Sequence, residues 1–191
     1  MKNLRLFIAI EIPLVLKERL NKVQQSLREY TTGVKWVSQD NFHLTLKFLG
    51  DTPENKCNDI GEAIQQSCQQ FSAFTLSLQG LGTFPGKGNP KVLWTGVHGD
   101  KDRLLGLQHS LDKKLANLNF PAEHRKYSPH LTLGRMKDFS DTDRLVTAIT
   151  KHKQEKFGQW QVTNIHLIQS TLTPSGPIYK PLKTVELALS H

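Results

Sequence analysis

The chain has 191 residues, 37% of them hydrophobic and 22% charged, which suits one domain or two small packed lobes with a real core. Its formal net charge of +8 and pI near 9.5 favour a polyanionic partner, either nucleic acid or a phosphorylated small molecule, without deciding between them. The apolar segments are too short for a secretory signal or a membrane helix, so we expect no membrane association.

The two cysteines, Cys57 and Cys68, lie 11 residues apart in a segment that is predicted to be helical. A helix would separate their Cα atoms by roughly 16 Å, which is too far for a disulfide, since its Cα atoms lie within about 7 Å of each other. With no disulfide and no CxxC motif, we expect a reducing cytoplasmic location.

Apolar periodicity and turn residues divide the first half of the chain into strands and helices. The predicted elements, in chain order, are a strand over 4–12; a helix that Pro13 begins, with Leu16, Leu20, Val23 and Leu27 on one stripe; strand structure over 34–49 around an Asp40-Asn41 turn; and a helix to about Gln70 that Asp51 or Thr52 caps and Pro53 begins. The strict alternation of strand and helix that is typical of a parallel sheet does not appear.

The second half is richer in strands. Its predicted elements are strands over 74–84 and 92–97, a helix from Leu104 to Leu118, an irregular segment over 119–129, a helix over 141–151, and an antiparallel pair over 160–172 and 178–189. We therefore expect an α+β fold, a bilobal pseudo-symmetric duplication of two antiparallel sheets flanked by helices with a central cleft. Residues 1–191 would form a single domain of two intertwined lobes. The Pro- and Gly-rich loop over 85–90 is either a substrate contact or a solvated hairpin connection.

One tetrapeptide occurs twice, as His43-Leu44-Thr45-Leu46 and as His130-Leu131-Thr132-Leu133. Successive side chains of a strand point to opposite faces, so each copy presents His and Thr on one face and buries its leucines. Of the eight histidines, only these two have Thr two residues later. If the two strands face each other across a groove, four polar groups converge there.

A facing pair of histidines fits metal-independent phosphodiester cleavage. Imidazole holds or releases a proton near neutral pH, so one ring can accept a proton from the attacking oxygen while the other donates one to the departing oxygen. Thr45 and Thr132 are placed to stabilise charge on the phosphoryl oxygens. Metal binding and a Ser/His/Asp triad are the competing interpretations, but the chain has no HExxH, no acidic residue beside either motif at ligand spacing, and no GxSxG.

Two cations follow the motifs. Arg135 would point away from His130 on a regular strand, but Gly134 could host a bulge that turns it into the groove. Lys47 has the parity of His43 and Thr45, so we expect it at the groove rim or simply exposed on the strand. Aromatic residues could stack on a base, although core packing is the better interpretation for most of them: Phe7, Trp36, Phe42, Phe84 and Tyr179.

His-Leu-Thr-Leu followed by Lys-Phe-Leu-Gly, and Ser-Pro-His-Leu-Thr-Leu-Gly-Arg later in the chain, resemble the paired HxTx motifs of the two-histidine (2H) phosphoesterases. The most similar branch is the bacterial RNA 2′,3′-cyclic phosphodiesterases, also called RNA 2′-5′ ligases. The likeness spans nearly the whole chain, from the Arg5 segment to Tyr179-Lys180-Pro181-Leu182. The paired motifs are highly specific, whereas the flanking segments only add support.

The resemblance implies hydrolysis of a terminal 2′,3′-cyclic phosphate of RNA to a 2′-phosphomonoester, in some members with reversible 2′-5′ ligation, and it implies no metal or other cofactor. It assigns His43 as proton donor and His130 as proton acceptor, with Thr45, Thr132 and Arg135 as phosphate contacts. The partner would be RNA with a cyclic phosphate end, and no membrane or obligate protein partner is inferred.

Two other functions stay open from the residues alone. One is a module that binds RNA ends or nucleotide phosphates without turning them over. The other is a phosphodiesterase that acts on a small cyclic nucleotide.

Overall fold

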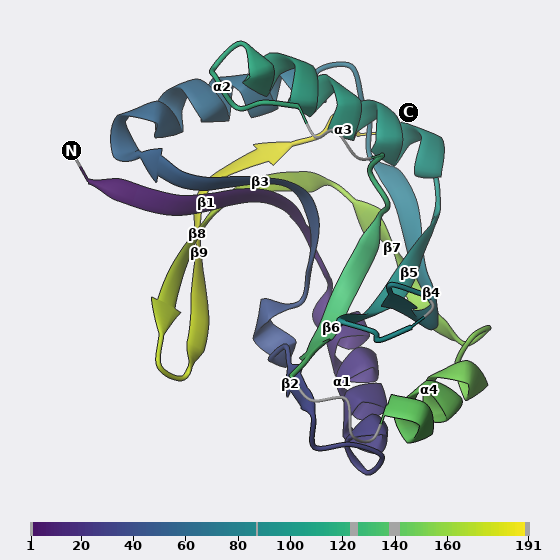
Figure 1. Ribbon diagram of the computed structural model, residues 1–191. Coiled ribbons are helices and arrows are strands. Elements are labelled where there is room, and N and C mark those ends of the chain that lie inside the picture. The colour runs from purple at the N-terminus through teal and green to yellow at the C-terminus, as the bar shows by residue number, and fades with distance from the viewer. Residues whose placement is uncertain (1, 87, 123–125, 138–141, 190–191) are drawn as a thin grey trace.

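Two curved antiparallel sheets form the framework of the protein, in a computed structural model that describes residues 2–86, 88–122, 126–137 and 142–189 (Figure 1). Sheet A has four strands, in the order β3 (His43–Pro53), β1 (Asn3–Glu11), β8 (Asn164–Thr173) and β9 (Gly176–Glu186). Sheet B has five, in the order β2 (Val34–Trp36), β6 (His130–Met136), β5 (Val92–Gly99), β4 (Phe74–Phe84) and β7 (Lys156–Val162).

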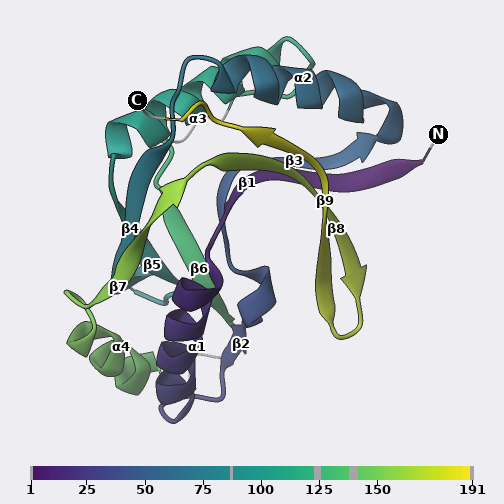
Figure 2. The same ribbon diagram turned by 180° about the vertical axis from the view of Figure 1, so that it is seen from behind.

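Helices cover one side of each sheet. α2 (Cys57–Cys68) and α3 (Lys101–Ala116) pack together over sheet A, whereas α1 (Leu14–Arg28) and α4 (Thr142–Lys151) lie against sheet B (Figures 1 and 2). The apolar stripe predicted for the first helix is buried as expected, and it joins a hydrophobic core that includes residues of both sheets. None of the described helices is long and apolar enough to cross a membrane.

The two sheets repeat one arrangement. Without β2, the order β6-β5-β4-β7 in sheet B matches β3-β1-β8-β9 in sheet A, and every neighbouring pair in both sheets is antiparallel. The motif strands β3 and β6 hold equivalent outer positions in this pattern. The expected α+β fold with two duplicated antiparallel sheets is thus confirmed, and sheet A draws its strands from both ends of the chain.

The prediction of one strand over 160–172 is wrong. β7 ends at Val162 in sheet B and β8 begins at Asn164 in sheet A, so the chain changes sheets at Thr163. No Gly or Pro marks this change, and residues on both sides of it are buried in the same core. A continuous apolar pattern therefore conceals the point where the chain passes from sheet B to sheet A.

The predicted helix cap at Asp51 or Thr52 is also wrong. Both residues extend β3, where they pair with Arg5 and Leu4 of β1. A 3-10 turn, η2 (Glu54–Lys56), follows before α2 begins at Cys57. The strand continues because β1 offers it a partner, which a local capping preference cannot reveal. The predicted start of the last helix, residue 141, lies outside the described residues.

Candidate active site

His43 is the first residue of β3 and lies opposite Glu11 of β1. Its imidazole packs between two aromatic rings, with centroid distances of 4.8 Å to Phe7 and 5.2 Å to Tyr179. Nδ1 lies 2.7 Å from the backbone oxygen of Asn41 in the 3-10 turn η1 (Gln39–Asn41). The ring is therefore held on the face of sheet A that is not covered by α2.

His130 begins β6 in the same way, opposite Gly96 of β5. Its Nδ1 lies 2.7 Å from the backbone oxygen of Ser128, and Phe84 contacts the ring edge to face at a centroid distance of 5.0 Å. In each copy of the motif, therefore, the imidazole binds the carbonyl two residues before it. A carbonyl can only accept, so Nδ1 carries hydrogen in both rings and Nε2 is left to accept a proton or donate one.

The two threonines follow the predicted alternation, because each half-buried Thr lies two residues after its His on the same strand face. In the part of the chain that the structure describes, neither hydroxyl has a hydrogen-bond partner, and neither Nε2 atom has one. Two imidazole nitrogens and two hydroxyls are thus free to meet a substrate. Within each motif, His and Thr share one strand face as the sequence predicts.

A β-bulge follows each motif at the same position. The pairing of β3 with β1 slips at Leu46, and the pairing of β6 with β5 slips at Leu133. Each extra residue reverses the alternation, so the second residue after the bulge returns to the face of the histidine. Phe48 occupies that position in β3 and Arg135 occupies it in β6.

The predicted bulge that returns Arg135 to the face of His130 is confirmed, although its extra residue is Leu133 rather than Gly134, which pairs with Leu93. Arg135 pairs with Val92, Thr132 pairs with Trp94, and these two partners lie on one face of β5. The guanidinium is exposed and has no ion pair or hydrogen bond among the described residues. Its positive charge reaches Tyr179 on β9, since it counteracts the rise that burial causes in the pKa of that phenol.

The prediction for Lys47 is wrong. The bulge at Leu46 turns this side chain into the core, where Nζ lies 2.6 Å from Oδ1 of Asp112 and 2.8 Å from the carbonyl oxygen of Pro121. Gln108 donates a hydrogen bond to the other oxygen of Asp112. Lys47 therefore connects β3 to α3 and to the segment that leads to the second motif.

Three further contacts, missed by sequence reasoning, fix the surroundings of the two motif strands. The hydroxyl of Tyr127 donates to the backbone oxygen of Thr45 at 2.8 Å. Gln24 Nε2 donates to the backbone oxygens of Leu133 at 2.7 Å and Val37 at 2.9 Å. Gln24 has a signal in the sequence, because it is a polar residue four positions after Leu20 on the buried stripe of α1. Tyr127 has no such signal.

Burial dominates the electrostatics of the His43 ring. Burial lowers the pKa of His43 to about 4, and the charge of Lys17 adds to this effect, whereas the bond to Asn41 opposes it. Lys17 lies 3.8 Å from Glu11 and donates to the backbone oxygen of Asp40 at 3.3 Å. His43 is consequently neutral near pH 7 in the free protein.

The predicted loop over 85–90 joins β4 to β5. It starts beside the second motif, because Phe84 contacts His130. Lys87 of this loop lies outside the described residues. The core interpretation holds for Phe7 and Phe42, which are buried, whereas three of the other aromatics stay partly exposed: Trp36, Phe84 and Tyr179.

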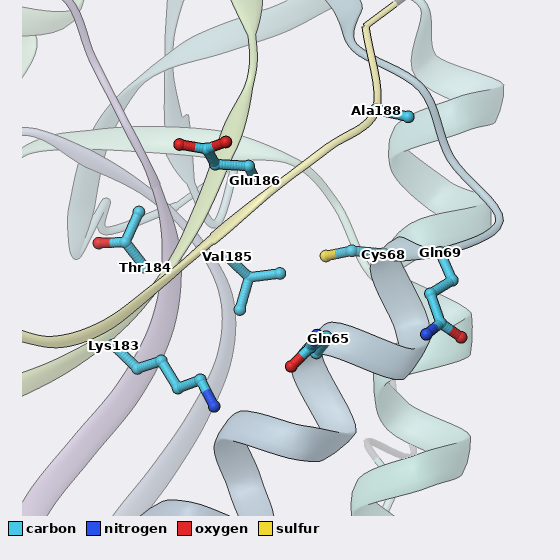
Figure 3. Close-up of a pocket in the computed structure, with 8 residues that line it drawn as sticks. All are labelled: Gln65, Cys68, Gln69, Lys183, Thr184, Val185, Glu186 and Ala188. Atoms are coloured by element: carbon cyan, nitrogen blue, oxygen red, sulfur yellow. The ribbon is translucent and has the colours of Figure 1, made fainter.

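Two cavities are lined by residues other than the motif histidines. One of about 500 Å³ lies between α2 and β9 and is lined by Cys68 and Lys183 among others (Figure 3). Another, of about 380 Å³, includes Glu11 and Lys17. Neither is lined by His43 or His130. Within the described ranges, no group of three or more His, Cys, Asp or Glu side chains is arranged to hold a metal ion.

Two antiparallel sheets that each contribute a His-x-Thr strand define the 2H phosphoesterase class. Solved structures share this fold. A Thermus thermophilus protein matches with a TM-score of 0.82 and 28% identity, over 98% of this chain and all of that one. Escherichia coli LigT complexed with 3′-AMP matches with a TM-score of 0.79 and 25% identity, over 97% of this chain and 99% of that one.

The chain belongs to the 2′-5′ RNA ligase superfamily, whose sequence profile matches residues 13–173. A Methanocaldococcus jannaschii protein named RNA 2′,3′-cyclic phosphodiesterase is 38% identical over 180 residues, which cover 94% of this chain and 99% of that protein. An Archaeoglobus fulgidus protein of the same name is 36% identical over 183 residues, covering 96% of this chain and all of that protein.

Proposed function

We propose that the protein is an RNA 2′,3′-cyclic phosphodiesterase that works by two-histidine acid and base catalysis. The observation that carries this proposal is the pair of adjacent motif strands, in which both imidazoles are fixed through Nδ1 and both threonine hydroxyls are free. Relatives of this name that match nearly the whole chain support it.

In the proposed reaction, His130 Nε2 accepts a proton from water as its oxygen attacks the phosphorus. The bond between phosphorus and the 3′ oxygen breaks, and protonated His43 donates its Nε2 hydrogen to that oxygen. The product is a 2′-phosphomonoester with a free 3′-hydroxyl. Thr45, Thr132 and Arg135 would stabilise the charge on the phosphoryl oxygens. With an RNA 5′-hydroxyl in place of water, the same step would form a 2′-5′ linkage.

The role of His43 as acid requires the substrate. Its pKa of about 4 leaves it neutral in the free protein at pH 7, and a bound phosphate anion beside the ring would favour the charged form. Substrate binding and protonation of His43 are therefore coupled in this proposal.

Placement of the reaction in the cytoplasm is supported by the free thiols of both cysteines.

The direct test uses a short RNA that ends in a 2′,3′-cyclic phosphate, incubated with the protein in the presence of EDTA. We expect multiple turnovers and a product whose phosphate stays on the 2′ oxygen. Tight binding with an unconsumed cyclic phosphate would instead indicate a phosphate-binding module. Faster turnover of a cyclic mononucleotide than of the RNA would identify a small-molecule enzyme.

A further inference from the structure

The charges of two arginines act on Tyr179, and neither arginine has a partner in the part of the chain that the structure describes. Its ring contacts Phe7 at 5.0 Å and His43 at 5.2 Å. The charges of Arg135, from sheet B, and Arg5, from sheet A, both act on its phenol, because both oppose the rise that burial causes in its pKa. The reaction described above uses Arg135 and leaves Arg5 without a role.

Arg5 lies on the same face of sheet A as the first motif. β1 alternates regularly, so Arg5 shares its face with Phe7 and Ala9, and Ala9 pairs with Thr45. The Arg5 side chain is exposed, and although Asp51 is its cross-strand neighbour, the two form no ion pair. A guanidinium on this face that has no carboxylate partner among the described residues is available to bind phosphate.

Exposed apolar side chains lie on the same face of sheet A as Arg5. Phe48, 62% exposed, is the cross-strand partner of Phe7. Leu172, 65% exposed, lies on the β8–β9 hairpin, two residues after Ser170, which pairs with Tyr179. The face that begins at His43 therefore continues outward as an aromatic and apolar surface that also carries Arg5. Such a surface suits single-stranded nucleic acid, whose bases stack while its phosphates meet basic groups.

We infer that Arg5 binds the phosphodiester that joins the terminal nucleotide of the RNA to the nucleotide before it. This inference rests on the proposed function, because the cyclic phosphate must lie between the two histidines. The terminal nucleoside would then lie over Tyr179, with its own phosphate towards Arg135 and the preceding phosphate towards Arg5. A mononucleotide lacks the second phosphate, so Arg5 distinguishes an RNA end from a free cyclic nucleotide.

The test compares kcat/KM for a dinucleotide and a mononucleotide, each with a 2′,3′-cyclic phosphate. A hydrogen bond between charged groups contributes enough to predict a loss of roughly 10-fold or more for Arg5→Gln on the dinucleotide. Turnover of the mononucleotide should stay unchanged, which also proves that the variant is folded. Arg144→Gln on α4, an exposed arginine that likewise has no partner within the described ranges, is the matched control and should change neither rate.

A second substrate separates charge from shape. This substrate is a dinucleotide with a 2′-deoxy upstream nucleotide and an uncharged methylphosphonate linkage. On it, kcat/KM of the parent protein should fall about as much as Arg5→Gln lowers kcat/KM on the normal linkage. For the Arg5→Gln variant, the uncharged linkage should cause no further loss. Equal losses for Arg5→Gln on dinucleotide and mononucleotide would overturn the inference while leaving the proposed function intact. If the parent consumes neither substrate, the proposed function itself fails.

Discussion

The two motif strands, β3 and β6, carry identical tetrapeptides in different surroundings. Both fix the imidazole through the carbonyl two residues earlier, and both bulge at the final leucine. Beyond the bulge, β3 continues with Lys47 in the core and Phe48 on the site face, whereas β6 has Gly134 and Arg135 there. The tetrapeptide thus sets the orientation of each ring, and its neighbours decide what else each half supplies.

The rings also differ in cover. His43 is packed against Phe7 and Tyr179, whereas His130 has a ring contact with Phe84. This cover is the main reason why the pKa of His43 falls to about 4. The tertiary environment rather than the motif therefore sets the protonation of His43 in the free protein, and substrate binding has to raise its pKa before the ring can act as the acid.

Removing either ring should have the largest effect. His43→Ala and His130→Ala are each expected to lower kcat/KM on the cyclic phosphate RNA by about 10² to 10⁴, the usual contribution of a general acid or base. The matched control is His109→Ala, because His109 is exposed on α3 and should tolerate the change. Near-normal turnover in either motif variant would contradict the claim that both histidines take part in catalysis.

The buried cation of β3 should matter for stability. Lys47→Met leaves Asp112 buried without its partner and is expected to lower the free energy of unfolding by about 3–5 kcal/mol, as measured by urea unfolding at pH 7. Lys47→Met combined with Asp112→Leu should recover part of this loss. A single variant as stable as the parent would mean that the pair contributes nothing.

Gly134 of β6 holds the position that corresponds to Lys47 of β3, and a side chain there should destabilise the protein by steric clash. A Cβ atom at Gly134 would lie 2.5 Å from Cγ1 of Val34, so Gly134→Ala is expected to cost about 1–3 kcal/mol by forcing β2 away from β6. Differential hydrogen exchange should locate the loosening at β2. Unchanged exchange there would show that the strands adjust without cost.

The exposed cation of β6 tests phosphate recognition. Arg135→Lys keeps the charge but loses the planar fork that holds two phosphate oxygens, so kcat/KM should fall by roughly 10-fold, a loss of about 1.4 kcal/mol in transition-state stabilisation. Phe48→Leu, at the equivalent position of β3, should lose less. A larger loss for Phe48→Leu than for Arg135→Lys would contradict the assignment of phosphate recognition to β6.

The smallest expected effect is a shift in titration. NMR should find that the His43 ring titrates near pH 4 in the free protein, and that Lys17→Met raises its pKa because a nearby positive charge is removed. Since the folded-state pKa lies below the unfolded value of about 6.5, the unfolded chain binds more protons between these values. Stability should therefore fall as the pH drops from about 6.5 to 4. An unshifted pKa in Lys17→Met would exclude this coupling.

Sequence reasoning succeeded where the signal is local. Strand alternation placed His and Thr on one face, and Gly134 indicated the bulge that turns Arg135. It failed for Lys47, because the equivalent bulge at Leu46 has no glycine to mark it and arises from pairing with β1. The sheet change at Thr163 and the contact of Tyr127 with β3 were likewise hidden, since both depend on residues distant in the chain.

The central claim is that the two motifs form one catalytic unit, and a double-mutant cycle tests it most directly. Single-turnover rates on the cyclic phosphate RNA would be measured for His43→Ala, His130→Ala and the double variant. Residues that act together show strongly non-additive losses, so we predict that the double variant is no more than a few-fold slower than the slower single variant. A double variant whose loss equals the product of the two single losses would contradict the account.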